Sequence, residues 1–574
     1  MKKILLLSIG FLLTTKLMLA QCPTDTLFST QLEIDSFAIN YPLCDSLSIR
    51  LVINGSDITD LTPLSNIKYV GEYLSLVENN SLQSLNGLNN IERIEGRFYI
   101  YRNPSLQTLE GLEKLKYIGD GLYLNANNLL QNLVGLDSLS YIGGNLYIDN
   151  NNGLKSLTGL NSLTALDADL IVVQNDSIVN FQGFNQINSI RGSCTISESN
   201  NLTNFVGFDQ LDTIYSNLVV DNNPLLLNFD GLTNLDSVRK IDCNSNPSII
   251  NFSGLNGIKF LDKLEVYNCN ILQNFVGLDL LESVDIFRCY NNSFLNNFEG
   301  LAALKTTNTF VVENCASLSN FQGLFVLEKV VNSLKVFNNP QILNFEGLNT
   351  VSSLGDFFTE SCDNLHDFQG FVNLTNISKL LSISENPRLN SFSGLESVLT
   401  VNGGLKIFNN DSLSSLAALE ALTFIGSNSG TFDTYVEITE NEILQFCNTD
   451  LICEYLNTNV DSITYFNNAI GCNSNPEVLD SCGFVIIGID ENSAVQNLMN
   501  VYPNPFTNKI VLNNFVDGSN ISIYNSIGQK INLPIHSFNQ EKIILNTEKL
   551  FAGIYFIKTI DKNKLVQRFK IIKE

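Results

Sequence analysis

Three carboxylates and two histidines are the side chains of this 574-residue chain that are best suited to catalysis. We expect Asp221, Asp242 and Glu265 to point outward from successive turns of a stacked sheet, about 5 Å apart. Retaining glycosidases use two carboxylates at about that separation to cleave polysaccharides. The histidines, His366 and His536, belong to no Ser-His or Cys-His arrangement, no metal-binding motif and no phosphate loop. A polysaccharide-acting enzyme is therefore the alternative hypothesis, and we expect no cofactor and no metal site.

Aromatic side chains beside arginines form a second group of residues that could bind a ligand. Its members are Tyr99, Tyr101, Tyr123, Tyr147, Arg97 and Arg102. Exposed aromatics next to arginine are typical of surfaces that bind proteins or glycans. Aromatic residues also favour strands for their own sake and can simply shield a sheet, so both interpretations of this group stay open.

The bulk composition limits which classes of protein can carry these residues. Charged residues make up 16% of the chain and apolar residues 44%, which excludes a disordered protein. The net charge of −25 repels phosphate backbones, so we expect no nucleic acid partner. At this length one globular core is not enough, and the chain must contain several domains or a repeat array.

The first twenty residues have the pattern of a signal peptide. Lys2 and Lys3 precede the apolar stretch Ile4–Leu13, and a small residue, Ala20, ends the segment. Cys22 raises the alternative of a lipid anchor, but Gln21 stands where that signal needs a small residue. No later stretch approaches twenty apolar residues, so we expect no transmembrane segment and a mature chain outside the cytoplasm, where disulfides persist.

A glycine recurs through most of the chain at intervals of 23 or 24 residues. The series is Gly87, Gly111, Gly135, Gly159, Gly183, Gly207, Gly231, Gly254, Gly277, Gly300, Gly323, Gly347, Gly370 and Gly394. Pro63 and Ala418 stand one interval outside each end, as in terminal repeats that depart from the pattern. Self-similarity at a fixed period of this length predicts a solenoid.

The apolar spacing changes within each repeat. Leu74-x-Leu76 alternates like a short strand, whereas the run from Asn79 to Ile94 is apolar at every third position, which fits a return path with little α-helix. Equivalent positions form an Asn or Cys column from Asn79 to Asn410 and a Phe column from Phe181 to Phe392. Both columns are expected to hold the solenoid together from inside.

These motifs resemble the leucine-rich repeat. The strand motif Leu74-x-Leu76-x-x-Asn79 includes its Asn-or-Cys position, and the next leucine, Leu82, comes one residue later than in most such repeats. The length, the return path and the Gly-Leu step are closer to the receptor L-domain variety. The resemblance implies a β-rich solenoid of about 16 rungs of 23–24 residues over residues 51–446, followed by a small β-sandwich.

Twelve cysteines divide equally between the array and its flanks. Within one column the array cysteines are two rungs apart, about 9.6 Å, which is too far for a disulfide, so we expect buried thiols. The flanks, residues 21–50 and 447–488, are expected to cap the core with helices near Ser29–Asn40 and Thr449–Leu456. Cys22 would pair with Cys44. The four remaining cysteines allow three pairings, of which we favour Cys447–Cys453 with Cys472–Cys482.

Residues 489–500 read as a linker to a C-terminal module, 501–574, with five short strands. Its motifs are Tyr502-Pro503-Asn504-Pro505, the segment Leu550–Tyr555 with Gly553 and Tyr555, and a lysine-rich end. They resemble the C-terminal sorting domain of the type IX secretion system of Bacteroidota. The resemblance implies the secretion machinery as a partner, export across the outer membrane, removal of the module, and attachment to the outer surface or release.

Together these patterns predict a secreted or cell-surface adhesion protein. Its exposed sheet is expected to recognise a protein or glycan ligand, with the tyrosines and arginines named above as the candidate binding residues.

Overall fold

The computed structural model describes residues 22–426, 435–458, 463–482, 500–513, 520–525, 530–533, 535–539, 542–560 and 566–573. The signal-peptide segment and all but the last residue of the linker lie outside these ranges. Within them, no helix has the length and apolar character needed to cross a membrane.

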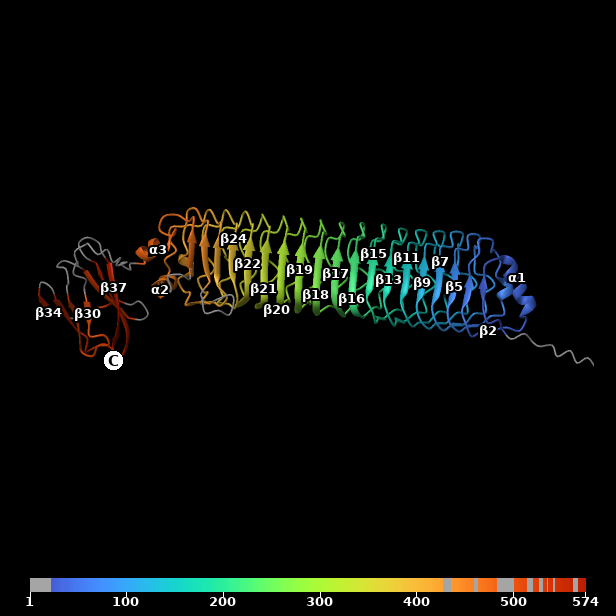
Figure 1. The fold of residues 1–574 in the computed structure, drawn as a ribbon, viewed down its shortest axis with the longest axis horizontal. Coiled ribbons are helices and arrows are strands. Elements are labelled where there is room, and N and C mark those ends of the chain that lie inside the picture. The colour runs from blue at the N-terminus through green and yellow to red at the C-terminus, as the bar shows by residue number, and fades with distance from the viewer. Residues whose placement is uncertain are drawn as a thin grey trace, which may run out of the picture.

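The body of the molecule is an elongated solenoid in which parallel strands stack side by side along the long axis (Figure 1). Each turn contributes one strand to a column whose members are in register with the strands above and below. In chain order this first column consists of β1 Leu27–Phe28, β3 Leu51–Ile53, β5 Leu74–Val77, β7 Phe98–Tyr101, β9 Leu122–Asn125, β11 Leu146–Asp149, β13 Leu170–Val173, β15 Cys194–Ser197, β16 Thr213–Asp221, β17 Ser237–Asn244, β18 Phe260–Tyr267, β19 Ser283–Tyr290, β20 Thr306–Glu313, β21 Lys329–Phe337, β22 Ser353–Glu360, β24 Leu381–Ser384, β26 Leu405–Phe408, β28 Val436–Thr439 and β29 Ile463–Phe466. The predicted leucine-rich solenoid with little helix is confirmed. Among the described residues the first column has 19 strands, more than the predicted number of about 16 rungs, mainly because β1 and β29 extend it into both predicted caps.

On ten of the described turns a second, shorter strand precedes the strand of the first column, and these short strands form a second column. It consists of β2 Ser46–Leu47, β4 Tyr69–Val70, β6 Arg93–Ile94, β8 Tyr117–Ile118, β10 Tyr141–Ile142, β12 Ala165–Leu166, β14 Ser189–Ile190, β23 Asn376–Ile377, β25 Thr400–Val401 and β27 Phe424–Ile425. From β16 to β22 the two columns merge, and one strand of eight or nine residues runs through the corner. The 23-residue repeats cluster in this stretch because a continuous strand needs fewer residues at the corner.

Inward side chains fill the solenoid as continuous columns. The strand leucines, the Asn column and the Phe column are all buried, and the rings of Phe229 and Phe252 stack with centroids 5.4 Å apart. The repeating glycine lies where one turn passes over the next. At Gly231, φ is +110° and an added Cβ would lie 2.1 Å from the carbonyl oxygen of Phe205, so the position requires glycine.

The N-terminal cap consists of α1 Gln31–Asn40 and the disulfide Cys22–Cys44. Thr30 and Glu33 form a capping box at the start of the helix. Ile34 and Phe37 are buried against the first turns. The helix thus covers apolar core that the end of a solenoid would otherwise leave in water.

The C-terminal cap contains α2 Asp450–Thr458 and α3 Asn475–Ser481, and its disulfides correct the sequence prediction. Cys447 pairs with Cys472, and Cys453 pairs with Cys482. The predicted Cys447–Cys453 and Cys472–Cys482 pairs are wrong. They join cysteines close in sequence, whereas the fold stacks the segment around Cys472 directly on that around Cys447 and packs α2 on α3.

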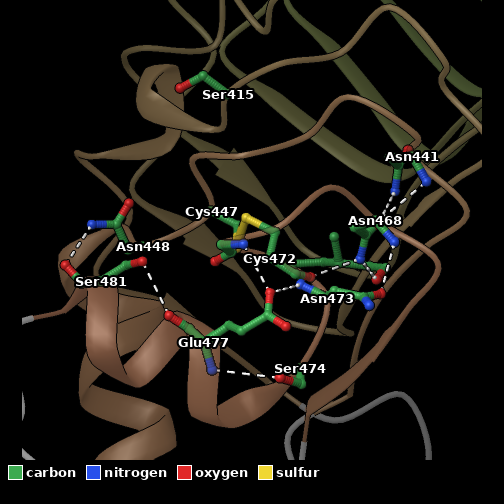
Figure 2. The surroundings of a disulfide bond; sticks show 12 residues. Ser415, Asn441, Cys447, Asn448, Asn468, Cys472, Asn473, Ser474, Glu477 and Ser481 are labelled. Carbon is green, nitrogen blue, oxygen red and sulfur yellow. Dashed lines mark hydrogen bonds between the residues drawn. A yellow bond between two sulfur atoms is a disulfide. The ribbon is translucent and has the colours of Figure 1, made fainter.

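Figure 2 shows what surrounds the Cys447–Cys472 bond. Glu477 accepts hydrogen bonds from the backbone N–H groups of Gly471 (2.8 Å) and Asn473 (3.2 Å). Asn473 in turn accepts from the backbone of Asn468, which ends the Asn column. The side chain of Asn473 therefore accepts the hydrogen bond that an asparagine of a further turn would otherwise accept.

The C-terminal module packs two four-stranded antiparallel sheets around one small core. The first sheet contains β30 Asn500–Tyr502, β31 Lys509–Asn513, β35 Lys542–Asn546 and β34 Ile535–Asn539, and the second contains β33 Lys530–Ile531, β32 Asn520–Asn525, β36 Gly553–Ile560 and β37 Val566–Lys573. Asn504 of the Tyr-Pro-Asn-Pro motif donates to the carbonyl of Lys570 and accepts from the backbone of Ile572, each at 2.8 Å. Tyr555 donates to the carbonyl of Phe551 at 2.9 Å. Asn504 thus joins the segment after β30 to β37, and Tyr555 closes the turn that leads into β36.

Candidate ligand-binding face

The tyrosines singled out in the sequence stand on three successive strands, β7, β9 and β11. Tyr99 is in register with Tyr123, and Tyr123 with Tyr147, so the three form one outward row. Tyr101 stands two residues after Tyr99 on the same side of β7, because alternate residues of a strand share a face. We call the outward surface of β5, β7, β9 and β11 the tyrosine face.

The rings of the tyrosine face contact one another in different orientations. Tyr99 and Tyr123 stack with centroids 5.1 Å apart, and Tyr123 and Tyr147 lie 6.0 Å apart at 39°. Tyr101 meets Tyr99 edge-on at 5.5 Å, and no other described ring covers it. The rings of the row therefore contact one another in sequence, whereas Tyr101 contacts one described ring, that of Tyr99.

Polar groups hold these rings in place. Arg97 donates to Asp120 at 2.9 Å and to the hydroxyl of Tyr99 at 3.1 Å. Tyr147 donates to Asp149 at 3.1 Å, and Asp149 also accepts from Asn125 at 2.6 Å. Side chains that are already ordered lose little entropy when a ligand binds.

The hydroxyl groups of Tyr101, Tyr123 and Tyr147 stay protonated at neutral pH. Burial, followed by the neighbouring tyrosines, raises the pKa of Tyr101 to about 12. Burial also raises the pKa of Tyr123, and burial and Asp149 raise that of Tyr147. Each of these hydroxyls therefore remains a hydrogen-bond donor as well as an acceptor.

Two open depressions adjoin on the tyrosine face. The larger, about 680 Å³, is lined by Glu72, Tyr73, Ser75, Val77, Gly96, Arg97, Tyr99, Tyr101 and Asp120. The smaller, about 480 Å³, is lined by Val77, Glu78, Tyr101, Arg102, Tyr123, Asn125, Tyr147 and Asp149. The structure thus places all six predicted residues around two adjoining hollows, with Tyr101 and Val77 between them.

The sequence interpretation missed one aromatic residue of this surface, Tyr73. It lies just before β5, lines the larger hollow, and its ring is 6.2 Å from that of Tyr99. Its hydroxyl accepts a 3.4 Å hydrogen bond from Arg50. The available signal was its position two residues before Ser75, on the outward side of the same strand.

The carboxylates of the alternative hypothesis lie farther along the same face. Asp242 is in register with Glu265, but Asp221 is in register with Asn244 and not with Asp242, so the predicted spacing of about 5 Å is wrong for Asp221 and Asp242. Glu265 is only 5% exposed and forms ion pairs with Lys240 (2.9 Å), Lys263 (2.8 Å) and Arg288 (3.1 Å). We call Glu265 with these three cations and Tyr267 the Glu265 cluster.

The Glu265 cluster is poorly suited to acid catalysis. Burial alone would raise the pKa of Glu265, but hydrogen bonds from Lys263, Tyr267, Lys240 and Arg288 outweigh it and lower the pKa to about 2. A general acid needs the opposite shift, toward the working pH. Burial raises the pKa of Asp221, but Asn244 donates to its carboxylate and opposes that shift.

Neither histidine belongs to this surface. The backbone of His366 bonds to Leu343 on the return path, and His536 lies in β34 of the C-terminal module. Among the described residues, no group of three or more His, Cys, Asp and Glu side chains is arranged to hold a metal ion.

Residues 500–574 match the family described as "Secretion system C-terminal sorting domain". This segment is the sorting domain of the type IX secretion system, and the protein is exported, either to the outer surface of the outer membrane or into the medium.

Solved structures with some likeness to the chain include two leucine-rich repeat proteins from Bacteroides. That of Bacteroides eggerthii is 12% identical, with 74% of this chain and 71% of the other covered and a TM-score of 0.28. That of Bacteroides ovatus is 13% identical, with 66% and 87% covered and a TM-score of 0.15. No curated protein matches the chain.

Proposed function

We propose that this exported leucine-rich solenoid is an adhesion or binding protein without catalytic activity, and that its ligand occupies the tyrosine face. The observation that carries the proposal is the pair of adjoining hollows around Tyr101, walled by side chains already fixed by hydrogen bonds. Rigid aromatic side chains and arginines dominate the energetics of binding surfaces.

The rest of the outward sheet supports a binding role over an enzymatic one. Its most buried carboxylate, Glu265, already has three cationic partners and a tyrosine, so it has little capacity left to transfer a proton. On the tyrosine face, by contrast, both hollows are open and directly accessible to a large ligand. Export to the cell exterior places that surface where foreign surfaces are met.

The test compares the full chain with the double variant Tyr99→Ala/Tyr123→Ala on a glycan array and on immobilised extracellular-matrix proteins. We expect retention of the full chain on at least one of these probes and loss of about tenfold or more in affinity in the double variant. Because both rings are half-buried on the surface, the melting temperature should change little. Equal binding by both proteins would remove the tyrosine face as the site.

Incubation of the full chain with a panel of polysaccharides addresses the enzymatic alternative. Under the proposal no new reducing ends form. If new reducing ends form with the full chain and do not form with Glu265→Gln, the protein is a hydrolase and the binding proposal is wrong.

A further inference from the structure

The two hollows differ from the typical centre of a protein–protein interface in what lines them. Val77 is the sole residue among their lining residues that is a leucine, isoleucine, valine or methionine. The other large apolar groups of the lining are tyrosine rings, each of which carries a hydroxyl. The fully buried centre of a protein interface is more apolar and poorer in charge than this.

The charges of the lining also limit the ligand. Four carboxylates, from Glu72, Glu78, Asp120 and Asp149, face two guanidinium groups, from Arg97 and Arg102. Arg97 is already paired with Asp120, and Arg102 with Glu78. The surface therefore has no unpaired cation to offer, and an anionic ligand would meet net repulsion in a protein of net charge −25.

Tyr101 supplies a different contact. It lines both hollows, so open space adjoins it on two sides, and its neighbours in register are the smaller side chains Val77 and Asn125. The face of an aromatic ring is electronegative and attracts groups with partial positive charge. The C–H groups on one side of a pyranose ring are such groups, and its hydroxyls match the carboxylates, amide and phenols around the rim.

From these contacts we infer that the tyrosine face binds a neutral, linear oligosaccharide that passes from one hollow into the other, with adjacent sugar units on either side of Tyr101. This inference rests on the proposed function and names its ligand class. Strands stack about 4.8 Å apart, and the two hollows together are lined by residues of β5, β7, β9 and β11. From β5 to β11 the face is about 14 Å long by that spacing, enough for a short stretch of chain.

The chemistry of the inferred contacts selects the variants for its test. Tyr101→Phe keeps the ring and loses the hydroxyl, whereas Tyr101→Ala loses both. Tyr290→Ala is the matched control, because Tyr290 lies in the same outward position on β19 and lines neither hollow. Its ring stacks on Tyr267 at 5.1 Å, so its removal makes a similar change to the sheet surface.

The experiment applies the full chain to an array of neutral linear oligosaccharides, the same chains bearing sulfate or uronic acid groups, and basic peptides. The best neutral oligosaccharide is then titrated calorimetrically against each variant. We expect neutral chains to bind better than their anionic counterparts. Tyr101→Ala should weaken binding about tenfold or more, Tyr101→Phe less than about threefold, and Tyr290→Ala not measurably.

Several results would overturn the inference. One is binding of neutral chains that survives Tyr101→Ala, and another is a preference for sulfated or uronic chains. A third is that no glycan binds, whereas peptides or matrix proteins bind to the full chain and no longer bind to Tyr99→Ala/Tyr123→Ala. That last result would leave the proposed binding function intact and identify a protein ligand, whereas loss of tyrosine dependence for every ligand would remove both.

Discussion

Asn127 donates two hydrogen bonds to the same atom of Asn151. Its backbone N–H lies 2.9 Å from Oδ1 of Asn151, and its side-chain Nδ2 lies 3.1 Å from that oxygen. The same Nδ2 also donates to the carbonyls of Ile100 and Asn125. One buried amide therefore bonds to backbone groups of two adjacent turns and to the side chain of Asn151 on a third, at the point where the strand ends, and its neighbours in the column repeat the arrangement.

Replacing Asn127 with alanine should open the solenoid locally. The change leaves the backbone N–H of Asn103 without its side-chain acceptor, takes one acceptor from Nδ2 of Asn103, and takes the amide donor from the carbonyls of Ile100 and Asn125, in a fully buried place. Each orphaned buried group costs about 1–3 kcal/mol, so we expect a loss of about 3 kcal/mol or more in the free energy of local opening. Hydrogen exchange of the amides between Asn103 and Asn151 measures it, because repeat proteins open turn by turn.

Asn127→Cys and the exposed Gln131→Ala serve as controls for that measurement. Cysteine already occupies the column at position 269, where its Sγ lies 3.4 Å from the carbonyl of Tyr267, so Asn127→Cys should cost less than alanine. Gln131→Ala should stay within about 0.5 kcal/mol of the parent. Equal protection in Asn127→Ala and Gln131→Ala would contradict the role assigned to the column.

The Asn and Phe columns were predictable because they depend only on the position of a residue within the repeat. Glycines spaced by 23 or 24 residues set the register, and the Asn and Phe positions follow from it. Contacts between different columns were harder to predict from the sequence, because they depend on the path of the chain within each turn. Comparing cysteines within a column showed them two rungs apart, yet Cys243 of the strand column and Cys269 of the Asn column bring their sulfur atoms within 3.6 Å.

The residues of the candidate binding site were predictable from the sequence, but the shape of the site was not. Outward tyrosines on consecutive strands follow from alternation, so Tyr99, Tyr123 and Tyr147 could be placed on one face. The hollows around Tyr101 could not, because their depth depends on how Arg97 and Asp149 fix neighbouring rings. The predicted Cys22–Cys44 pair is present, but the two pairings predicted for the C-terminal cap failed because spacing in sequence says nothing of how the segments of that cap stack on one another.

Gly231→Ala should destabilise the middle of the solenoid strongly. The glycine has a positive φ, and the added Cβ would lie 2.1 Å from a backbone carbonyl of the turn below, which cannot move without displacing Phe205. Steric overlap and the left-handed backbone together should cost about 3 kcal/mol or more. Thermal unfolding compares this variant with Asp230→Ala, an exposed neighbour in the same turn. A melting temperature equal to that of Asp230→Ala would show that the backbone relaxes around the methyl group.

Glu265→Gln should change both the stability of the protein and its acid response. The folded-state pKa of Glu265 is about 2, below its ordinary value of 4.5, so its charge stabilises the fold above about pH 4.5 and this contribution fades as the pH falls toward 2. Removing the charge leaves Lys240, Lys263 and Arg288 without their shared partner, which should cost about 3 kcal/mol at neutral pH. Glu282→Gln, which breaks an exposed pair with Lys305, should cost at most about 1 kcal/mol.

Urea unfolding from pH 7 to pH 2 separates these effects. The difference in stability between the parent and Glu265→Gln should shrink as the pH falls from about 4.5 toward 2, while Glu282→Gln follows the parent closely. A difference that is constant over this range would mean that loss of packing, and not loss of charge, accounts for the cost.

The twelve cysteines should titrate as two distinct sets. The six bonded cysteines link as Cys22–Cys44, Cys447–Cys472 and Cys453–Cys482, and the remaining six, all in the array, are free and buried. Burial raises the pKa of Cys194 to about 12, and that of Cys362 to about 11, so at neutral pH these thiols are both inaccessible and protonated. An aromatic disulfide reagent should therefore find no thiol in the native protein, six after denaturation without reductant, and twelve after reduction. Four thiols in the second condition would show that one close pair, such as Cys243 and Cys269, had oxidised, and rapid labelling of the native protein would contradict the burial of the array cysteines.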